Sequence, residues 1–269
     1  ADDTLTDLSG WVTVDNRSGA NYRNAKLQLV AGDINRVQEE INAMPRFAIA
    51  EKAMGVGGPA FESQAFFEYH LYNLKRKTTI KDNQTKQINF IEASNVRIAK
   101  EYEITGMPYF FTQAYRTNDY KVPVTVYLNF KNSKKNNLGM PLPAGVMRLY
   151  KKDKEGSLQF IGEDRIEHTP EDEKVRLELG KAFDLTAERI QTDFKQVTTR
   201  LYETEWKVSI RNHKDQDVTV HVTEKMSGNW NILKSNVTSK KKDAYTIQFD
   251  VKVPKKGQAE VVYRVSVGI

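Results

Sequence analysis

Alternation of apolar and polar residues dominates the chain, as in β-strands whose two faces meet different environments. Near the N-terminus, Val12 and Val14 share one strand face, and the strand ends at the turn cluster of residues 16–19. A second strand is expected over residues 25–32, and a hairpin is the simplest interpretation of the pair. Further strands are predicted over residues 65–74, 86–92, 96–104, 122–130, 146–150, 158–161 and 175–179.

Residues 122–130 give one of the cleanest strand signals. The inward set is Val122, Val124, Val126, Leu128 and Phe130. Pro123 cannot donate a ladder hydrogen bond, so its position indicates an edge strand or the first residues of a strand.

Residues 33–62 break the alternation. Four apolar residues are spaced for one face of a helix: Ile34, Val37, Ile41 and Met44. Pro45 interrupts that helix, and residues 55–59 (GVGGP) are typical of a flexible loop. We therefore expect a short helical or flexible insertion between strands.

The last 75 or so residues have a distinct pattern, which predicts short strands separated by turns. The predicted inward residues are Tyr202, Thr204, Trp206, Val208 and Ile210; Val218, Val220 and Val222; Tyr245, Ile247, Phe249, Val251 and Val253; and Ala259, Val261, Tyr263, Val265 and Val267. This pattern, with a tryptophan available for the core, predicts an immunoglobulin-like or fibronectin-like sandwich. Strands and helices do not alternate, which argues against a Rossmann or α/β-barrel fold.

The fold class predicted is therefore mainly β, built from antiparallel β-sandwich domains. We place an N-terminal β domain with the insertion at residues 1–194 and an immunoglobulin-like domain at residues 195–269. The length of 269 residues fits two domains. Apolar residues make up 39% and charged residues 28%, which is an ordinary globular balance.

The absence of cysteine excludes disulfides, thiolate metal sites and a cysteine nucleophile. It fits a reducing cytoplasm and equally an envelope protein. No apolar run approaches the roughly 20 residues of a membrane-spanning helix, so the chain is not expected to be transmembrane. No signal peptide is visible in the sequence.

The net charge of +6 permits contact with an anionic partner. The longest basic run, residues 240–242, has no interleaved aromatic residues of the kind that single-stranded nucleic acid requires. Acidic residues are mixed with basic ones along most of the chain. A soluble surface is therefore the simpler interpretation, and nucleic acid is not the expected partner.

The histidines provide two candidate sites, neither with zinc-binding spacing. His70 shares a predicted strand face with Glu68 and Tyr72, so a Glu–His pair could transfer protons if that face lined a cleft. The simpler interpretation is an exposed or half-buried strand face. Carboxylates surround His168, at residues 163–164 and 171–173. Such a cluster could hold a hard cation, but a polar turn is the simpler interpretation.

No motif assigns a catalytic, cofactor-binding or metal-binding residue. Residues 55–60 match a relaxed GxGxxA pattern, but they follow a helical stretch rather than a strand and lack the lysine of a P-loop. No GxSxG nucleophile elbow occurs.

The stretch DLSGWVTVDNRSGANYRNAKLQLVAGDINRV (residues 7–37) resembles a bacterial family of unknown function that is shared, more distantly, with the mucoidy-inhibitor A proteins. Residues 66–90, 142–189 and 202–224 carry the same resemblance. It implies export in Gram-negative bacteria, hence a periplasmic or envelope location. It also implies preceding sequence before Trp11, so a trimmed or proteolysed chain is expected. It brings no known site residues.

We therefore expect a non-catalytic envelope protein that acts as a scaffold or binding module for a glycan or protein partner, without a cofactor. The alternative is a carbohydrate-active hydrolase, with carboxylates from separate strands meeting in an interdomain cleft.

Overall fold

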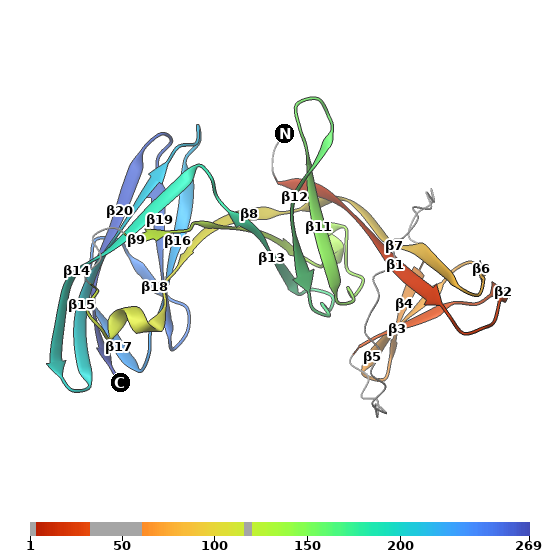
Figure 1. Cartoon of the computed structure of the whole chain (residues 1–269), viewed down its shortest axis with the longest axis horizontal. Coiled ribbons are helices and arrows are strands. Elements are labelled where there is room, and N and C mark those ends of the chain that lie inside the picture. Colours follow the sequence, from red (N-terminus) through yellow and green to blue (C-terminus); the bar gives the residue numbers. More distant parts are fainter. Residues whose placement is uncertain (1–3, 33–60, 116–119) are drawn as a thin grey trace. The chain divides into compact units, whose positions relative to one another are not determined.

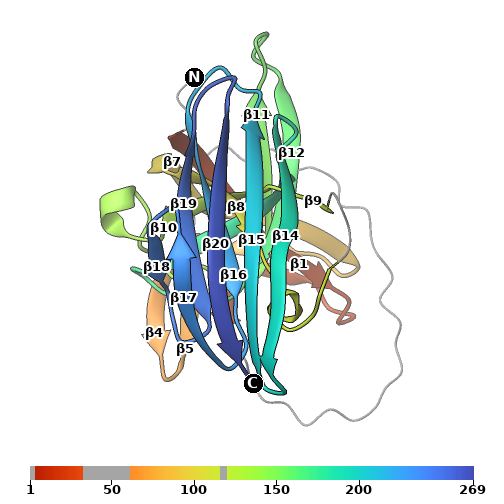
Figure 2. The ribbon, with the colours of Figure 1, turned by 90° about the vertical axis from the view of Figure 1, so that its left-hand side faces the viewer.

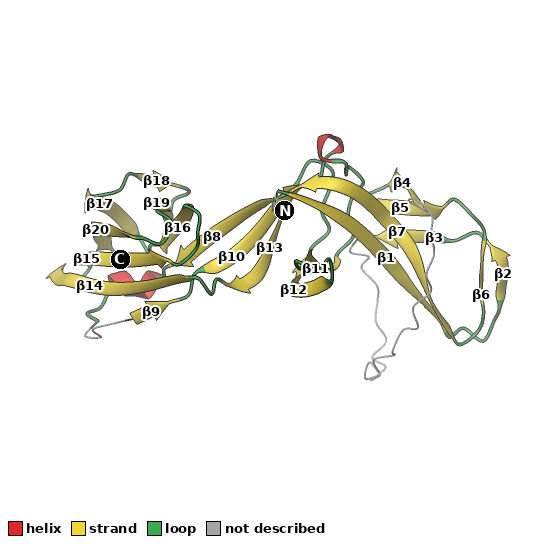
Figure 3. Cartoon of the chain, turned by 90° about the horizontal axis from the view of Figure 1, so that it is seen from above, coloured by secondary structure: helices red, strands yellow, loops and turns green. Residues whose placement is uncertain are grey.

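The computed structural model describes residues 4–32, 61–115 and 120–269 (Figure 1). The described chain is mainly β, with several antiparallel sheets and very little helix (Figure 3), which confirms the predicted fold class. Contacts divide it into two units. Unit 1 contains Ala1–Ala99, Asn129–Met147 and Arg165–Val175, and unit 2 contains Lys100–Leu128, Arg148–Asp164 and Arg176–Ile269.

Unit 2 is built on two sheets. Figure 2 shows β17, β20, β15 and β14 side by side in the first, which is five-stranded. Its strands, in spatial order, are β17 (Asn229–Ser235), β20 (Gln258–Gly268), β15 (Leu201–Asn212), β14 (Leu185–Thr198) and β9 (Tyr120–Val122).

The second sheet is six-stranded. Its strands, in spatial order, are β13 (Lys174–Lys181), β10 (Thr125–Lys131), β8 (Ala99–Thr105), β16 (Val218–Lys225), β19 (Thr246–Val253) and β18 (Ser239–Lys241). β16 pairs with β19 in antiparallel fashion and with β8 in parallel fashion.

The two sheets enclose one apolar core, to which β15, β16, β19 and β20 contribute most. The predicted inward residues fill it: Trp206 is 3% exposed, and Val208, Val220, Phe249 and Tyr263 are fully buried. One exception is Tyr245, which is 60% exposed because β19 begins one residue later. The alternation therefore identified the core face correctly. The immunoglobulin-like comparison stays a prediction.

Pro123 divides the strand that was predicted over residues 122–130. β9 ends at Val122 and pairs with β14, whereas β10 starts at Thr125 and belongs to the other sheet. The prediction of one strand was wrong, because a proline cannot continue the ladder and here the chain changes sheets. Pro123 itself lies between the two strands; β9 ends the five-stranded order, whereas β10 lies between β13 and β8 in the other sheet.

Unit 1 contains three small antiparallel sheets. Phe61, Tyr72 and Phe90 are buried there, and the rings of Tyr72 and Phe90 meet edge-on at 4.9 Å. The pairs are β1 (Leu5–Asn16) with β7 (Gln84–Arg97), β2 (Tyr22–Ala25) with β6 (Thr78–Ile80), and β5 (Tyr69–Leu74) with both β3 (Gln28–Ala31) and β4 (Phe61–Phe66).

Several strand predictions in the first 105 residues were wrong. The strand expected over residues 25–32 is divided between β2 and β3, and that expected over residues 96–104 is divided between β7, which continues to Arg97, and β8. The first predicted strand does not form a hairpin with residues 25–32, because β1 pairs with β7 from much later in the chain. Alternation shows which side chains of a strand share a face, but it does not show which strand is the hydrogen-bonding partner. The hairpin was predicted only because the two segments are close in sequence. The strand predicted over residues 65–74 is a hairpin, because Phe67 takes a left-handed backbone (φ 58°) and turns the chain between β4 and β5.

The predicted insertion at residues 33–62 lies almost entirely outside the described residues, although β4 already begins at Phe61. The predicted boundary near residue 195 falls within β14.

The remaining elements are the two-stranded sheet of β11 (Gly145–Lys152) and β12 (Leu158–Ile166), and the short 3-10 helices η1 (Pro108–Phe111) and η2 (Lys134–Asn136).

Candidate functional site

The strongest candidate site in unit 2 is a group of aromatic side chains around η1. The sequence MPYFFTQAY (residues 107–115) starts with an extended residue and places Pro108 at the beginning of the helix, where the fixed φ of proline fits and its missing N–H is not needed. The turn is closed by the N–H of Phe110, which donates to the carbonyl of Met107 at 3.0 Å. Phe110 and Phe111 point into the core, and Tyr109 stays 52% exposed.

Phe110 is the centre of an aromatic rim, which we define as Tyr109, Phe110, Tyr115 and Tyr120. The ring of Phe110 meets the other three edge-on, at centroid distances of 4.9 Å, 5.4 Å and 6.4 Å respectively. Edge-to-face contacts of this kind are favourable beyond the area they bury. Tyr120 is 51% exposed, so two tyrosine rings face solvent from fixed positions.

Hydrogen bonds fasten the rim to β14. The side chain of Gln191 accepts from the N–H of Tyr115 at 2.7 Å and donates to the carbonyl of Gln113 at 3.1 Å and to the hydroxyl of Thr204 at 2.9 Å. The exposed amide of Gln113 donates to the phenol of Tyr115 at 2.6 Å. The rim therefore combines apolar ring faces with oriented polar groups, which is the usual composition of a binding site.

A buried ion pair lies beneath the rim. Arg189 on β14 donates from Nη1 and Nη2 to both carboxylate oxygens of Glu224 on β16, at 2.9 Å and 2.7 Å, and both side chains are 0% exposed. Burial opposes the charge of Arg189, but the carboxylate of Glu224 outweighs it and raises the pKa of the guanidinium. The guanidinium carbon is also 5.1 Å from the centre of the Phe110 ring. The pair thus links the two sheets directly below the rim.

Gly106 makes this arrangement possible. A Cβ atom at Gly106 would lie 1.7 Å from Oε2 of Glu224. The N–H of Gly106 donates to the carbonyl of Thr223 at 2.8 Å, which holds the segment before η1 against β16. Only glycine allows the backbone to approach the carboxylate so closely.

Two buried donors near the rim have no hydrogen-bond partner in the described structure, namely Nε of Arg189 and Nε1 of Trp206. The guanidinium carbon lies 5.6 Å from the Trp206 ring centre. Unsatisfied buried donors are costly, and these two lie beside the packed rings of Phe110 and Trp206. This region therefore has hydrogen-bonding capacity that the described residues do not use.

The predicted Glu68–His70 pair does not share a strand face. Glu68 lies in the turn between β4 and β5, whereas His70 lies in β5 opposite Ala65. The ring of His70 is 6.4 Å from that of Tyr72. The proposed proton-transfer pair was therefore wrong in its geometry, because the turn at Phe67 was not recognised.

Several of the carboxylates near His168 form ion pairs with basic side chains. Glu163 pairs with Arg148 at 3.0 Å, and Glu171 pairs with Lys134 at 3.2 Å. Nδ1 of His168 accepts from the N–H of Ala144 at 3.2 Å. In the described ranges, no three His, Asp or Glu side chains are grouped so that they could hold a metal ion.

His221 lies on the outer face of the six-stranded sheet, as its position opposite the valine stripe predicts. Its Nδ1 is 2.7 Å from Oδ1 of Asp250, directly across the β16–β19 pair. Lys240, from the predicted basic run, pairs with the same carboxylate. Burial alone would raise the pKa of Asp250, but the hydrogen bonds from Lys240, Gln248 and His221 lower it well below its ordinary value. These contacts form a polar network on the sheet surface.

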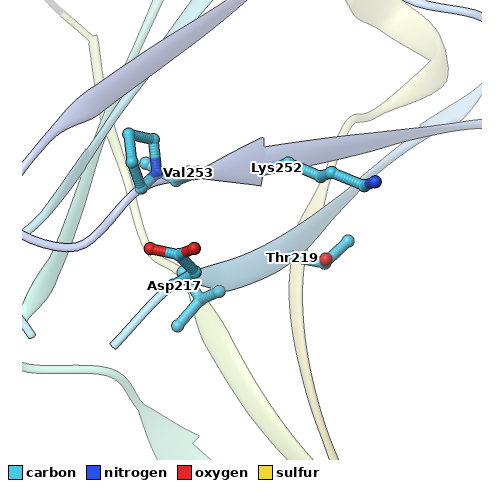
Figure 4. Close-up of a pocket in the computed structure, with 6 residues that line it drawn as sticks. Asp217, Thr219, Lys252 and Val253 are labelled. Atoms are coloured by element: carbon cyan, nitrogen blue, oxygen red, sulfur yellow. The ribbon is translucent and has the colours of Figure 1, made fainter. Parts of the chain in front are cut away.

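A shallow depression lies at one end of β16 and β19 (Figure 4). Its volume of about 240 Å³ is smaller than a typical ligand pocket. Asp217, at its edge, accepts from the N–H of Lys255 at 2.8 Å and so holds a turn. The lining residues are Asp217, Val218, Thr219, Lys252, Val253 and Pro254.

Comparisons with protein-family models, curated proteins and solved structures found no match to this chain. Among the helices of the described residues, none is long and apolar enough to cross a membrane.

The sequence prediction missed the aromatic rim. The available signal was the density of aromatic residues after Gly106: Tyr109, Phe110, Phe111, Tyr115 and Tyr120. Arg189 and Glu224 were missed as well. Each continues an inward apolar set, Arg189 after Leu185 and Ala187, and Glu224 after Val222, so each is a charge at a core position.

Proposed function

We propose that this chain is a non-catalytic binding protein of the bacterial envelope, and that its aromatic rim binds a glycan. The observation that carries the proposal is the pair of half-exposed tyrosine rings, Tyr109 and Tyr120, held edge-on against Phe110. The envelope location rests on the sequence resemblance alone.

The chemistry of the rim suits a sugar. The C–H faces of a pyranose ring are apolar and carry slight positive charge, so they stack on the negative face of an aromatic ring. Sugar hydroxyls both donate and accept hydrogen bonds, as phenols and side-chain amides do. The exposed amide of Gln113 lies beside the phenol of Tyr115, so ring faces and directional polar groups occur together.

The rigidity of the rim favours binding. The buried pair of Arg189 and Glu224 and the hydrogen bonds of Gln191 fix the backbone beneath it. A surface that is already ordered loses little conformational entropy when it binds. We therefore expect affinity from a rim with only a few contact residues.

A glycan array with the full-length protein tests the proposal, followed by titration of the best glycan by calorimetry. Tyr109→Ala and Tyr120→Ala should each weaken binding about fivefold, since one aromatic stacking contact contributes about 1 kcal/mol. Tyr245→Ala is the matched control, because Tyr245 is 60% exposed in the same unit but outside the rim. It should bind like the wild type.

Equal losses in all three variants, or no glycan retained by the wild type, would refute the proposal. A pull-down in which Tyr109→Ala loses a protein partner while the array stays blank would assign the rim to protein binding. Release of new reducing ends from an array glycan would favour the hydrolase alternative.

A further inference from the structure

The β11–β12 hairpin, drawn in green in Figure 1, carries a group of exposed apolar side chains that does not belong to the aromatic rim. Tyr150 is 52% exposed, Leu158 63% and Phe160 56%, and all three flank the turn that joins the strands. The rings of Tyr150 and Phe160 meet edge-on at 5.7 Å. Exposed apolar side chains that are contiguous, rather than scattered, usually mark an interaction site.

The hairpin tip, which we define as residues 149–160, is ordered by its own turn. The carboxylate of Asp153 accepts from the N–H groups of Glu155 and Ser157, at 3.0 Å and 2.9 Å, and from the amide of Gln159 at 2.8 Å. In the described structure β11 and β12 pair only with each other. A two-stranded sheet alone is marginally stable in water, so the apolar tip gains from a surface that covers it.

The charges of the tip indicate which surface fits. The tip has more basic than acidic side chains. Its exposed lysines, which flank the apolar residues, are Lys151, Lys152 and Lys154, and its carboxylates are Asp153 and Glu155. Asp153 is turned into the loop by its three hydrogen bonds. Lysines that flank aromatic side chains match the negative headgroups and apolar boundary of a lipid bilayer.

We propose that the β11–β12 hairpin docks on an anionic lipid surface, with Tyr150, Leu158 and Phe160 inserted at the headgroup boundary. The lysines contact the lipid phosphates. A second copy of the chain fits less well, because the three side chains together expose roughly 300 Å², well below the roughly 800 Å² per partner of a stable protein interface. If the tips of two copies paired, their lysines would also come close together and repel each other.

Co-sedimentation of the full-length protein with lipid vesicles tests this proposal. The wild type should bind vesicles of equal parts phosphatidylglycerol and phosphatidylcholine, and bind pure phosphatidylcholine at least tenfold more weakly. Tyr150→Ser with Phe160→Ser should lower the partition coefficient at least tenfold. Lys152→Gln with Lys154→Gln should lower it roughly thirtyfold on anionic vesicles only, because each lysine contributes about 1 kcal/mol there.

The matched control is Phe67→Ser with Phe183→Ser, because these phenylalanines are 88% and 95% exposed but lie outside the hairpin. The control should bind within twofold of the wild type, and circular dichroism should show every variant folded. The proposal is overturned if the wild type ignores anionic vesicles or if control and hairpin variants lose binding equally. It is also overturned if the hairpin variants abolish a dimer detected by analytical ultracentrifugation. Glycan binding by the aromatic rim is unaffected in each case.

Discussion

The buried pair of Arg189 and Glu224 makes the sharpest stability prediction. Glu224→Gln keeps the shape of the side chain but removes its charge, which leaves the guanidinium buried without a counter-charge. Of the two charge-assisted hydrogen bonds, at 2.9 Å and 2.7 Å, one is weakened and the other is lost, because the amide nitrogen of glutamine cannot accept. Each such bond contributes about 1.5–3 kcal/mol, and breaking a fully buried pair costs about 3–5 kcal/mol. We expect a loss of about 4 kcal/mol in the free energy of unfolding.

Urea denaturation followed by tryptophan fluorescence measures this loss, because Trp206 and Trp230 both lie in unit 2. The surface control is Glu188→Gln, whose partner Arg211 is 45% exposed. Exposed pairs contribute about 0–1 kcal/mol, so this variant should unfold almost like the wild type.

The double replacement Arg189→Met with Glu224→Leu separates the cost of an unpaired charge from the contribution of the pair. Apolar residues of similar volume can replace a buried pair with little loss. The double variant should therefore be more stable than Glu224→Gln. A loss below about 1 kcal/mol in Glu224→Gln, or one no larger than in the surface control, would refute the reasoning.

Three further predictions concern single positions. Gly106→Ala forces a methyl group against the carboxylate beneath it and should cost about 3 kcal/mol in a thermal melt, whereas Gly145→Ala, with no atom closer than 4.0 Å, should cost little. Burial alone would raise the pKa of Asp250, but hydrogen bonds led by that of Lys240 lower it below 3.8. Asp250 therefore stabilises the fold above about pH 4, and this contribution is lost as the pH falls. Asp250→Asn should flatten the acid limb of the urea midpoint plotted against pH. Burial raises the pKa of Tyr72 to about 12. The stabilisation that comes from the protonated Tyr72 phenol is complete below about pH 10 and is lost as the pH rises towards about 12. Tyr72→Phe should therefore remove a tyrosine step near pH 12 from an ultraviolet pH titration.

The sequence predicted strands and core faces well, because burial on one face imposes a period of two. The inward valines of β16 and β20 follow directly from that rule. Strand partners did not follow, since β1 pairs with a strand about 70 positions away, as in the register of Asp15 with Thr85. Pairing depends on tertiary contacts that local alternation does not encode.

The candidate site was not predicted, for a different reason. In the sequence of a single strand, a charged residue at an inward position indicates that the buried apolar run has ended. Arg189 and Glu224 are buried because they pair with each other across two sheets, and the sequence of either strand alone does not show that contact. Tyr109 and Tyr115 lie in or just after a 3-10 turn, where neither the period of a strand nor that of a helix applies, and Tyr120 starts the three-residue strand β9, which is too short to show a period.

The most direct test of glycan binding by the aromatic rim is nuclear magnetic resonance of the tyrosine rings during titration with the best array glycan. We expect the ring signals of Tyr109 and Tyr120 to shift in proportion to bound sugar, while those of Tyr245 stay fixed. Shifts confined to residues outside the rim, with Tyr109 and Tyr120 unchanged at saturation, would contradict it.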